Sequence, residues 1–249
     1  MTEPQFLTAA ELEELKAVDT CTVSNAIERF DVRLRNEGFF SNETRCQLPN
    51  LPPMVGFAAT ARIRSESPPI NHRCYYDRMD WWHYLASLPK PSVMVLQDTD
   101  EKPGLGAFVG EIHAAIGQAL NCVGCVTNGS VRDLPAVEKM GFQLFAPGLS
   151  VSHSYAHIVD FGEPVDVGGL KIHPGDLLHG DRHGLLVIPF EVATRIAGEA
   201  ATILREERAL IDFCASPEFS LHELSNRMTK ADAHCGQPWS SRFGKHEHA

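Results

Sequence analysis

The chain has 249 residues, of which 43% are hydrophobic and 22% charged, and its formal net charge is −10. This balance indicates a globular protein and argues against binding to nucleic acid or to an anionic membrane, because both need a basic surface. No apolar run is as long as a membrane span, and the first residues lack the basic-then-apolar order of a signal peptide. We therefore expect a cytoplasmic protein with no nucleic-acid or membrane partner.

Two helices are predicted at the start of the chain, over residues 8–18 and 20–30. The first opens with a capping box, Thr8 with Glu11, and continues with an apolar stripe. A loop follows and leads into a strand over residues 55–63, where apolar side chains share one parity.

The next segment combines an aromatic helix with a glycine-containing loop. Residues 77–88 are predicted to form a helix with three aromatic side chains, which we place in the core or at a subunit contact rather than around a ligand. A short buried strand over residues 93–96 precedes the loop. Another helix is predicted over residues 108–120, with its first turn near Gly110, and free N–H groups at such a helix start can bind an anion.

Seven cysteines are present, and without a secretion signal this odd number indicates reduced thiols. Cys122 and Cys125 form a single C-x-x-C pair. A zinc site would need two further ligands at comparable spacing, and the sequence has no second pair. Because the pair lies in a strand-like run rather than at a helix start, we interpret both residues as buried core cysteines rather than as a redox pair.

The stretch from Val123 to Pro135 points most directly to chemistry. It begins as a short buried strand and reaches a turn at Asn128 and the glycine after it, two residue types that tolerate positive φ. Arg132 and Asp133 follow, adjacent and opposite in charge, and on a turn both can face one pocket. Asp133 can also cap a helix that begins near Pro135.

Two interpretations of this Arg–Asp pair are open. One is a solvated surface ion pair, which is common on turns. The other is a functional site, because the pair lies between two apolar strand-like runs in the middle of the chain. In that case the carboxylate suits a hard metal ion and the guanidinium suits an oxyanion.

The remaining elements are predicted as a short helix over residues 137–140, a strand over 141–145, and an all-β region over 164–188 with glycine-containing turns. A long helix over residues 190–213 and a second helix from Ser220 complete the pattern. Parallel-type strands that alternate with helices, followed by a β-meander, indicate an α/β sandwich with a partly mixed sheet.

We expect a single domain over residues 1–249. Its C-terminal helices should lie at about residues 190–230, and the tail over residues 231–249 is expected to be frayed.

Four stretches together resemble the RraA-like proteins: Gly110-Glu111, Asn-Gly-Ser-Val-Arg-Asp at 128–133, 168–176, and 180–189. The resemblance covers roughly residues 15–215. This family includes class II pyruvate aldolases that act on 4-hydroxy-4-methyl-2-oxoglutarate and 4-carboxy-4-hydroxy-2-oxoadipate. The resemblance implies an α/β/β/α sandwich of the swivelling phosphohistidine-domain type and a homotrimer or hexamer. Some members are labelled as menaquinone methyltransferases, but this sequence has no Gly-rich methyl-donor loop after a first strand.

The resemblance also assigns roles to residues at matching positions. Asp133 resembles the carboxylate that binds a divalent metal directly, and Arg132 resembles the residue that contacts the pyruvyl oxygens. Glu111 resembles an acidic residue that reaches the metal through water. A further acid would come from the long C-terminal helix of a neighbouring subunit and would also act through water. Glu206 and Glu207 are both candidates, and we prefer Glu207.

The substrate carboxylate would be received at the predicted helix start, by Gly110 and by the backbone of Ile112 and His113. The implied activity is that of a lyase that uses Mg²⁺ or Mn²⁺ in preference to Zn²⁺. It would cleave a 2-oxo acid by retro-aldol chemistry and release pyruvate, with oxaloacetate decarboxylation as a second activity.

Two other functions fit the same resemblance. One is a non-catalytic regulator that binds a ribonuclease, as RraA itself does. The other is a metal-dependent lyase or decarboxylase for a different oxo acid or sugar acid. The joint presence of Glu111, Arg132 and Asp133 favours the enzyme, because a regulator need not keep the metal pocket.

The sequence departs from the family pattern at three places. Asn128 stands where the family has Asp, His113 occupies a position that is often apolar, and the segment 152–157 is rich in histidine. We expect His113 and at least one of His153 and His157 to line the pocket. They would select a substrate other than the simple methyl-oxoglutarate, or recruit a softer ion such as Zn²⁺ or Mn²⁺. A hydrogen-bonded core histidine is the alternative for His113.

Overall fold

The computed structural model describes residues 7–41, 43–69 and 78–234. The chain begins with α1 (Ala9–Lys16) and α2 (Thr20–Phe30), close to the predicted bounds. The capping box of α1 is present: the Thr8 hydroxyl accepts from the Glu11 N–H, and the Glu11 carboxylate accepts from the Thr8 N–H at 2.7 Å. These contacts satisfy N–H groups that the first helical turn leaves unpaired.

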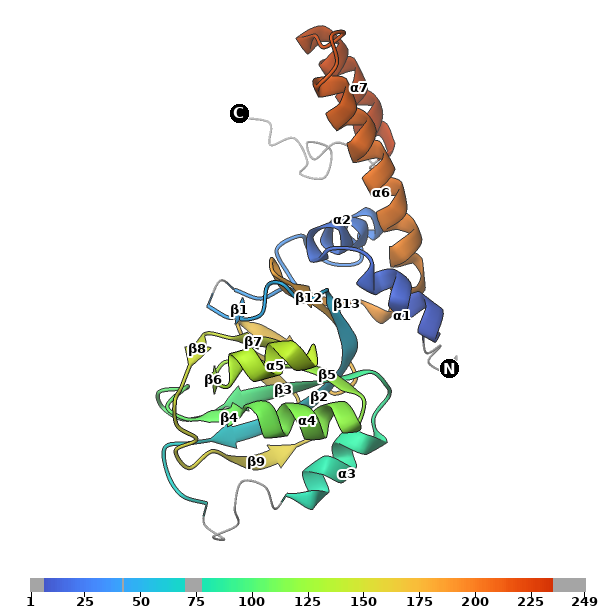
Figure 1. The fold of residues 1–249 in the computed structure, drawn as a ribbon. Coiled ribbons are helices and arrows are strands. Elements are labelled where there is room, and N and C mark those ends of the chain that lie inside the picture. The colour runs from blue at the N-terminus through green and yellow to red at the C-terminus, as the bar shows by residue number, and fades with distance from the viewer. Residues whose placement is uncertain (1–6, 42, 70–77, 235–249) are drawn as a thin grey trace, which may run out of the picture.

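A mixed sheet forms the centre of the molecule (Figure 1). In spatial order its strands are β1 (Arg45–Cys46), β7 (Gln143–Ala146), β5 (Cys122–Thr127), β3 (Ser92–Asp98), β2 (Met54–Arg64), β12 (Leu177–Asp181) and β13 (Gly184–Ile188). A further strand, β9 (His157–Phe161), also pairs with β2. Strands β2, β3, β5 and β7 are parallel to one another. At one edge β1 pairs antiparallel with β7, and on the other side β12 pairs antiparallel with β2. The predicted partly mixed sheet is therefore confirmed.

Side chains of β2 are buried on both faces of the sheet. Ala59 and Ile63 pack toward α3 (Met79–Ser87), α4 (Glu111–Ala119) and α5 (Leu134–Met140), which cover one face. Ala58 packs on the opposite face with the hairpin of β10 (Val165–Val167) and β11 (Leu170–Ile172). At the N-terminal end of the strand, Val55 and Phe57 pack with α1 and α2. Helices on one face of the sheet and the hairpin on the other thus form the layers of the predicted α/β sandwich, and α1 and α2 cover one end of the sheet.

The aromatic residues of α3 belong to the core, as predicted. Trp81 is fully buried, and its ring lies 5.8 Å from Tyr84 and 5.9 Å from Phe161, between ring centroids. Cys122 and Cys125 of β5 are buried in the same cluster. Burial raises the pKa of both thiols, which keeps them neutral and unreactive. The interpretation of this pair as core cysteines is confirmed.

A second, smaller sheet of parallel strands consists of β4 (Ala107–Val109), β6 (Ser130–Val131) and β8 (Gly148–Leu149). The prediction of helix from residue 108 was wrong at this point, because Phe108 and Val109 belong to β4 and α4 begins only at Glu111. An aromatic and a β-branched side chain suit a buried strand, and the alanine-rich sequence after Gly110 suits a helix.

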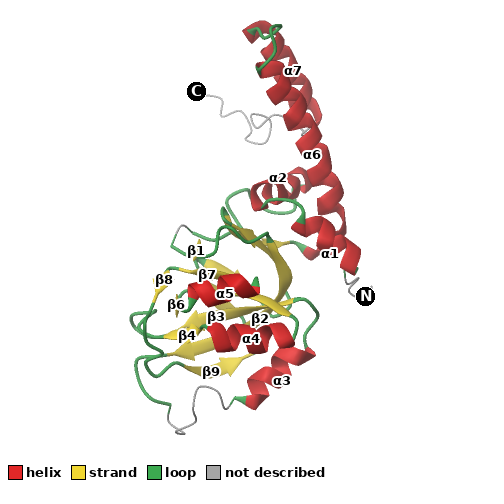
Figure 2. Cartoon of the chain, viewed as in Figure 1, coloured by secondary structure: helices red, strands yellow, loops and turns green. Residues whose placement is uncertain are grey.

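The C-terminal part forms a helical hairpin that projects from the body of the molecule (Figure 2). It consists of a short 3₁₀ turn η1 (Phe190–Val192), α6 (Ala193–Cys214) and α7 (Leu221–His234). The first half of α6 packs on α1 and α2, and Arg227 of α7 stacks on Phe213 of α6 at 4.1 Å. The predicted frayed tail falls largely on residues 235–249, outside the described part. Within that described part, no helix has the length and apolar character needed to cross a lipid bilayer.

Candidate functional site

The Arg132–Asp133 pair lies on a sharp turn between β6 and α5. The Arg132 N–H donates to the Val109 carbonyl of β4 at 3.1 Å, which ties the turn to the small sheet. Asp133 has φ 58° and ψ 32°, a left-handed conformation that costs a residue with a side chain on the order of 1 kcal/mol. The turn therefore holds Asp133 in a conformation that an unconstrained chain would avoid.

The Asp133 carboxylate faces the start of α4 rather than its own helix. Its Oδ2 accepts from the Glu111 N–H at 3.1 Å, and its Oδ1 accepts from the Arg132 Nε–H at 3.2 Å. Gly110, at the N-cap position of α4, has no side chain to make this cap, so Asp133 supplies it from a distant turn. The predicted cap on the helix near Pro135 is made only by the backbone carbonyl of Asp133.

The Asp133 carboxylate is ionised and accessible. Partial burial raises its pKa, but hydrogen bonds from the Glu111 N–H and the Arg132 side chain, the positive charge of Arg132 and a contribution from His153 outweigh burial and lower the pKa below its usual value. Its side chain is 35% exposed and that of Arg132 is 28% exposed. An accessible, ionised carboxylate is the ligand that Mg²⁺ and Mn²⁺ prefer, so this residue fits the implied metal.

Gly110 permits the close approach of this pair to α4. A Cβ atom at Gly110 would collide with the Asp133 Oδ2 and would lie 2.8 Å from the Arg132 Cγ. A side chain here would therefore push both residues away from the helix start. Gly110 is therefore needed because a side chain would leave no room for Asp133 and Arg132, and not because its backbone has a positive φ.

The first turn of α4 completes the arrangement. The Glu111 and Ile112 side chains are exposed, and the N–H groups of Ile112 and His113 belong to the turn whose donors have no carbonyl partner within the helix. Such a turn attracts an anion. The structure thus brings together one ionised carboxylate, one guanidinium and the first turn of α4.

The His113 side chain lies in the core beneath this helix start. It is 1% exposed, and its ring centroid is 4.6 Å from that of Phe108 and 5.6 Å from that of Trp82. Burial, with a smaller effect of His153, lowers the pKa of His113 to about 3, so the ring is neutral at physiological pH. The prediction that the His113 side chain lines the pocket was therefore wrong, because helix geometry turns the ring into the core, and a contact with the substrate would come through its backbone N–H.

The two other predicted histidines lie on a loop and a strand. The His153 Nδ1 is 3.3 Å from the Ala107 carbonyl of β4, and this residue affects the pKa of both Asp133 and His113. It is therefore close to the candidate site. His157 begins β9 and pairs with Arg64 at the end of β2.

Helix α6, which carries both predicted acids, lies away from α5, which follows Asp133, in the same chain (Figure 1). Glu206 forms an ion pair with Arg29 of α2, and the Glu207 Oε1 accepts from Asn25 at 3.5 Å. One chain alone therefore does not bring either acid to the site. Their contribution to a neighbouring subunit stays a prediction.

Asn128 has a different role from the one predicted. Neither Asn128 nor the glycine after it has a positive φ. Instead, the Asn128 Oδ1 accepts from the Asp98 N–H at 2.7 Å, and its Nδ2 donates to the Asp98 carbonyl at 2.9 Å. The buried Asp98 carboxylate in turn accepts from the Gly104 N–H at 2.8 Å. These contacts hold the loop between Asp98 and Gly104 in place. They arise because Asp98 ends β3 and Asn128 directly follows β5, the adjacent parallel strand.

A protein-family model described as "RraA-like: Aldolase/RraA" matches residues 20–187. A curated relative from Halalkalibacterium halodurans, named "Putative 4-hydroxy-4-methyl-2-oxoglutarate aldolase", is 33% identical over 84 residues, which cover 33% of this chain and 40% of the relative. The chain spans only 21% and 40% of the lengths of the curated relatives that it matches.

Two solved structures share the fold. An uncharacterized protein from Pseudomonas syringae pv. tomato str. DC3000 has a TM-score of 0.69 at 23% identity, over 92% of this chain and 98% of that one. RraAS2 of Streptomyces coelicolor, described as an unusual member of the RNase ES inhibitor RraA protein family, has a TM-score of 0.62 at 20% identity, over 82% and 96%. At these identities the likeness shows the fold alone.

Proposed function

The chain belongs to the RraA-like family, and from this premise we propose that it is a divalent-metal-dependent lyase that cleaves a 2-oxo acid by retro-aldol chemistry and releases pyruvate. The observation that carries the proposal is the ionised Asp133 carboxylate held beside the Arg132 guanidinium at the start of α4. Oxaloacetate decarboxylation would be a second activity, because both reactions pass through the enolate of pyruvate.

Mg²⁺ or Mn²⁺ is the ion that this donor set supports. Asp133 would bind it directly and Glu111 through water. Mg²⁺ is usually bound by only one or two carboxylates and keeps several of its water ligands, which fits this arrangement. The bound ion would supply an electrophile for the oxygens of the 2-oxo acid. Zn²⁺ fits less well here, because the two ligands assigned to the ion, Asp133 and Glu111, are carboxylates rather than thiolates or imidazoles.

Arg132 would stabilise the negative charge that develops on the enolate. Its Nε–H is used by Asp133, which leaves the two terminal nitrogens of the planar guanidinium for a substrate oxygen. Because Asp133 also fixes the orientation of the guanidinium, this charge needs little rearrangement during the reaction. A lysine would keep the positive charge but would lose the planar, fork-like arrangement of N–H donors that the guanidinium offers.

The start of α4 would orient the substrate. Its carboxylate would accept from the N–H groups of Ile112 and His113, over the space left by Gly110. The Glu111 carboxylate, exposed on the same turn, would take the proton of the 4-hydroxyl directly or through a water molecule. His153, whose Nδ1 lies 3.3 Å from the Ala107 carbonyl of the strand that leads into α4, would meet a second acidic group of the substrate.

Assembly into a homotrimer or hexamer would complete the site. Large apolar side chains are exposed around it, and contiguous exposed apolar surface marks a contact with another molecule. They are Leu105 at 55%, Ile112 at 55%, Leu149 at 57%, Val151 at 96% and Tyr155 at 55% exposure. A second copy on this face would exclude water from the pocket, and Glu207 would reach the metal of a neighbour through water.

The direct test is pyruvate release across a panel of 2-oxo acids, including the methyl and carboxy hydroxy-oxo acids, oxaloacetate and a sugar-derived 2-oxo acid. We expect release with Mg²⁺ or Mn²⁺ and none after chelation. Asp166→Asn, an exposed carboxylate on β10, serves as the matched control for Asp133→Asn. A folded, metal-loaded protein that releases no pyruvate from any acid would favour the regulatory branch, to which the description of RraAS2 points.

A further inference from the structure

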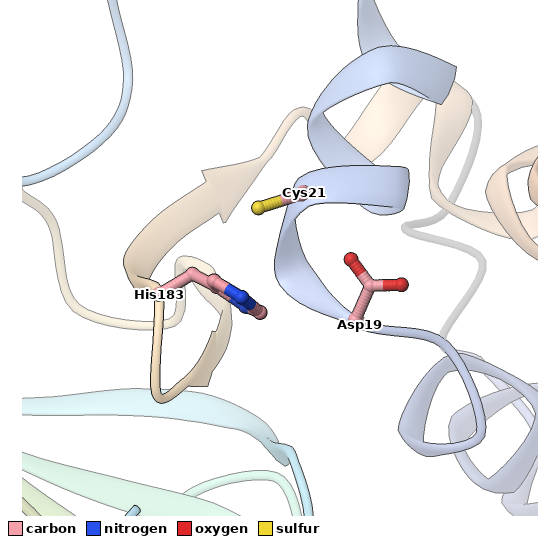
Figure 3. Close-up of side chains that lie close together, drawn as sticks. All are labelled: Asp19, Cys21 and His183. Atoms are coloured by element: carbon pink, nitrogen blue, oxygen red, sulfur yellow. The ribbon is translucent and has the colours of Figure 1, made fainter.

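A second group of metal-ligating side chains lies where α2 begins beside the turn between β12 and β13 (Figure 3). One ligand atom from each of Asp19, Cys21 and His183 lies within 4.8 Å of the other two. Ligands of one Zn²⁺ ion stand about 2.0–2.3 Å from it, so atoms spaced by roughly 4–5 Å can share an ion after small side-chain rotations. The three residues come from two segments that only the fold brings together.

Asp19 is held in place as the N-cap of α2. Its Oδ1 accepts from the Thr22 N–H at 3.0 Å, and its Oδ2 accepts from the Thr22 hydroxyl at 2.8 Å. Each carboxylate oxygen keeps a further lone pair for a cation. Cys21 follows in the first turn of α2, with an exposed thiol. Two ligands of the group are thus positioned by one helix start.

Asp181, at the end of β12, orients the third ligand. This carboxylate is 6% exposed, and its Oδ1 accepts from the His183 N–H at 2.8 Å and lies 3.1 Å from the His183 Nδ1. Its Oδ2 accepts from the Thr20 N–H at 3.0 Å, which joins the turn to α2. A proton on Nδ1 that faces Asp181 leaves the lone pair of Nε2 for a metal, as in carboxylate–histidine–zinc arrangements.

We propose that Asp19, Cys21 and His183 bind a transition-metal ion of the Zn²⁺ class, at a site separate from Asp133. Thiolate sulfur, imidazole nitrogen and carboxylate oxygen together suit Zn²⁺ and exclude Mg²⁺, which prefers oxygen alone. Helix capping explains Asp19, and pairing with Asp181 explains His183. Neither the helix cap nor the pairing with Asp181 explains why the ligand atoms of Asp19 and His183 both lie within 4.8 Å of the Cys21 thiol.

The ion would link the N-terminal helices to the main sheet. Asp19 and Cys21 belong to the start of α2, whereas His183 belongs to the β12–β13 turn, so the metal bridges two layers of the fold. With three protein ligands, the fourth position of a tetrahedral site would hold water, because Cys21 and His183 are exposed. The role that follows is structural: the ion stabilises this contact and takes no part in the chemistry at Asp133.

Cobalt is the probe that reports on the thiolate directly. Titration of the full chain with Co²⁺ should give a sulfur-to-cobalt charge-transfer absorption that saturates at one ion per chain and disappears when Zn²⁺ is added. Cys21→Ser should remove the absorption, and both this variant and His183→Gln should weaken Zn²⁺ binding by roughly 100-fold or more. Asp181→Asn should weaken it by about 10–100-fold, because it loosens the histidine.

Other cysteines provide matched controls. Cys214→Ser changes an exposed thiol on α6. Cys235→Ser changes the cysteine of the C-terminal sequence, which also contains the metal-ligating residue types His246 and His248. Both variants and Asp133→Asn should keep the absorption. If wild-type protein gives no saturable absorption, if Cys21→Ser keeps it, or if a control variant loses it, the proposed site is wrong.

Thermal unfolding separates loss of metal from loss of fold. Without metal, Cys21→Ser should unfold at the same temperature as the wild type, since its side chain is exposed. Saturating Zn²⁺ should raise the unfolding temperature of the wild type by roughly 5 °C or more and leave Cys21→Ser unchanged. An equal rise in both proteins would show that Zn²⁺ acts elsewhere, and would overturn the proposal.

Discussion

The turn at Arg132–Asp133 and the cluster of Asp19, Cys21 and His183 differ in both ligand chemistry and backbone. The first offers one carboxylate beside a guanidinium, on a residue with a left-handed conformation. The second offers oxygen, sulfur and nitrogen, and its Asp19 has an ordinary extended conformation, with φ −73° and ψ 157°. A lone carboxylate next to a fixed cation suits an ion shared with an anionic substrate. A mixed set suits an ion that the protein keeps.

This difference shows that the surroundings of an acid decide its use. Asp133 and Asp19 both accept from a backbone N–H at a helix start. Asp133, however, adopts a strained backbone and requires a glycine opposite to it, whereas Asp19 caps its own helix. A left-handed backbone held at a residue that carries a side chain is a reason to expect function at Asp133.

The largest effect should come from Asp133→Asn. Loss of the negative charge removes the proposed metal ligand, and pyruvate release should fall by roughly 10³-fold. The amide oxygen can still accept from the Glu111 N–H, so the unfolding temperature should change little. Steady-state kinetics and thermal unfolding measure the two quantities. Residual activity within tenfold of the wild type would remove Asp133 from the mechanism.

Gly110→Ala should also reduce activity strongly, by about 10²-fold, because the new methyl group displaces Asp133 and Arg132. We expect a loss of about 1–3 kcal/mol in the free energy of unfolding as well. Gly198→Ala on α6 is the matched control, because a Cβ there meets nothing within 4 Å. That change should stabilise the protein by about 0.5–1 kcal/mol and leave kcat unchanged. Equal behaviour of the two variants would contradict the close approach at Gly110.

Arg132→Lys should lower kcat by roughly 10–100-fold, with a smaller change in KM for oxaloacetate, because lysine keeps the charge and loses the planar fork. Arg182→Lys, an exposed residue of the β12–β13 turn, is the matched control. Turnover of Arg132→Lys close to that of the wild type would mean that the guanidinium only pairs with Asp133.

His113 should control stability rather than turnover at low pH. Its pKa is about 3 in the folded chain, against 6.5 for a histidine side chain in water, so between these values the unfolded chain binds more protons. The free energy of unfolding should then fall as the pH decreases from about 6.5, by roughly 2 kcal/mol at pH 5. His113→Gln should reduce this slope, measured by urea unfolding at pH 7.5 and pH 5. His179, also buried with a lowered pKa, accounts for part of the remainder. An unchanged slope in His113→Gln would contradict the neutral buried ring.

The smallest effect on catalysis should come from Cys21→Ser. Because the cluster at α2 is separate from Asp133, pyruvate release with Mg²⁺ at moderate temperature should stay within about twofold of the wild type. Kinetics with and without added Zn²⁺ measure this directly. A large loss of activity in this variant would mean that the two regions are coupled.

Local patterns in the sequence predicted most of the elements. The capping box of α1, the bounds of α2 and the all-β region over residues 164–188 follow from caps, periodicity and turn residues. The error at Phe108 arose because a short buried strand and the first turn of a helix carry similar apolar residues. Only the pairing of β4 with β6, distant in sequence, distinguishes them.

The sequence alone selects Arg132 and Asp133 as candidates, but it does not indicate where the side chains of the candidate site point. Asp133 caps α4, a contact across the fold that spacing does not indicate. The burial of the His113 ring follows from helix geometry: two residues at about 100° each place it nearly opposite the exposed Glu111. The cluster of Asp19, Cys21 and His183 left no sequence signal, because its ligands come from a helix start and a distant hairpin turn.

The most direct test of the central claim is hydrogen–deuterium exchange at the methyl group of pyruvate, followed by proton NMR in D₂O. Enolate formation alone causes this exchange, so the natural substrate need not be known. The wild type should exchange the methyl protons with Mg²⁺ or Mn²⁺ and stop after chelation, Cys21→Ser should match it, and Asp133→Asn should not exchange above buffer. Exchange that persists in Asp133→Asn, or its absence in folded, metal-loaded wild type, would contradict an enolate-forming site at Asp133.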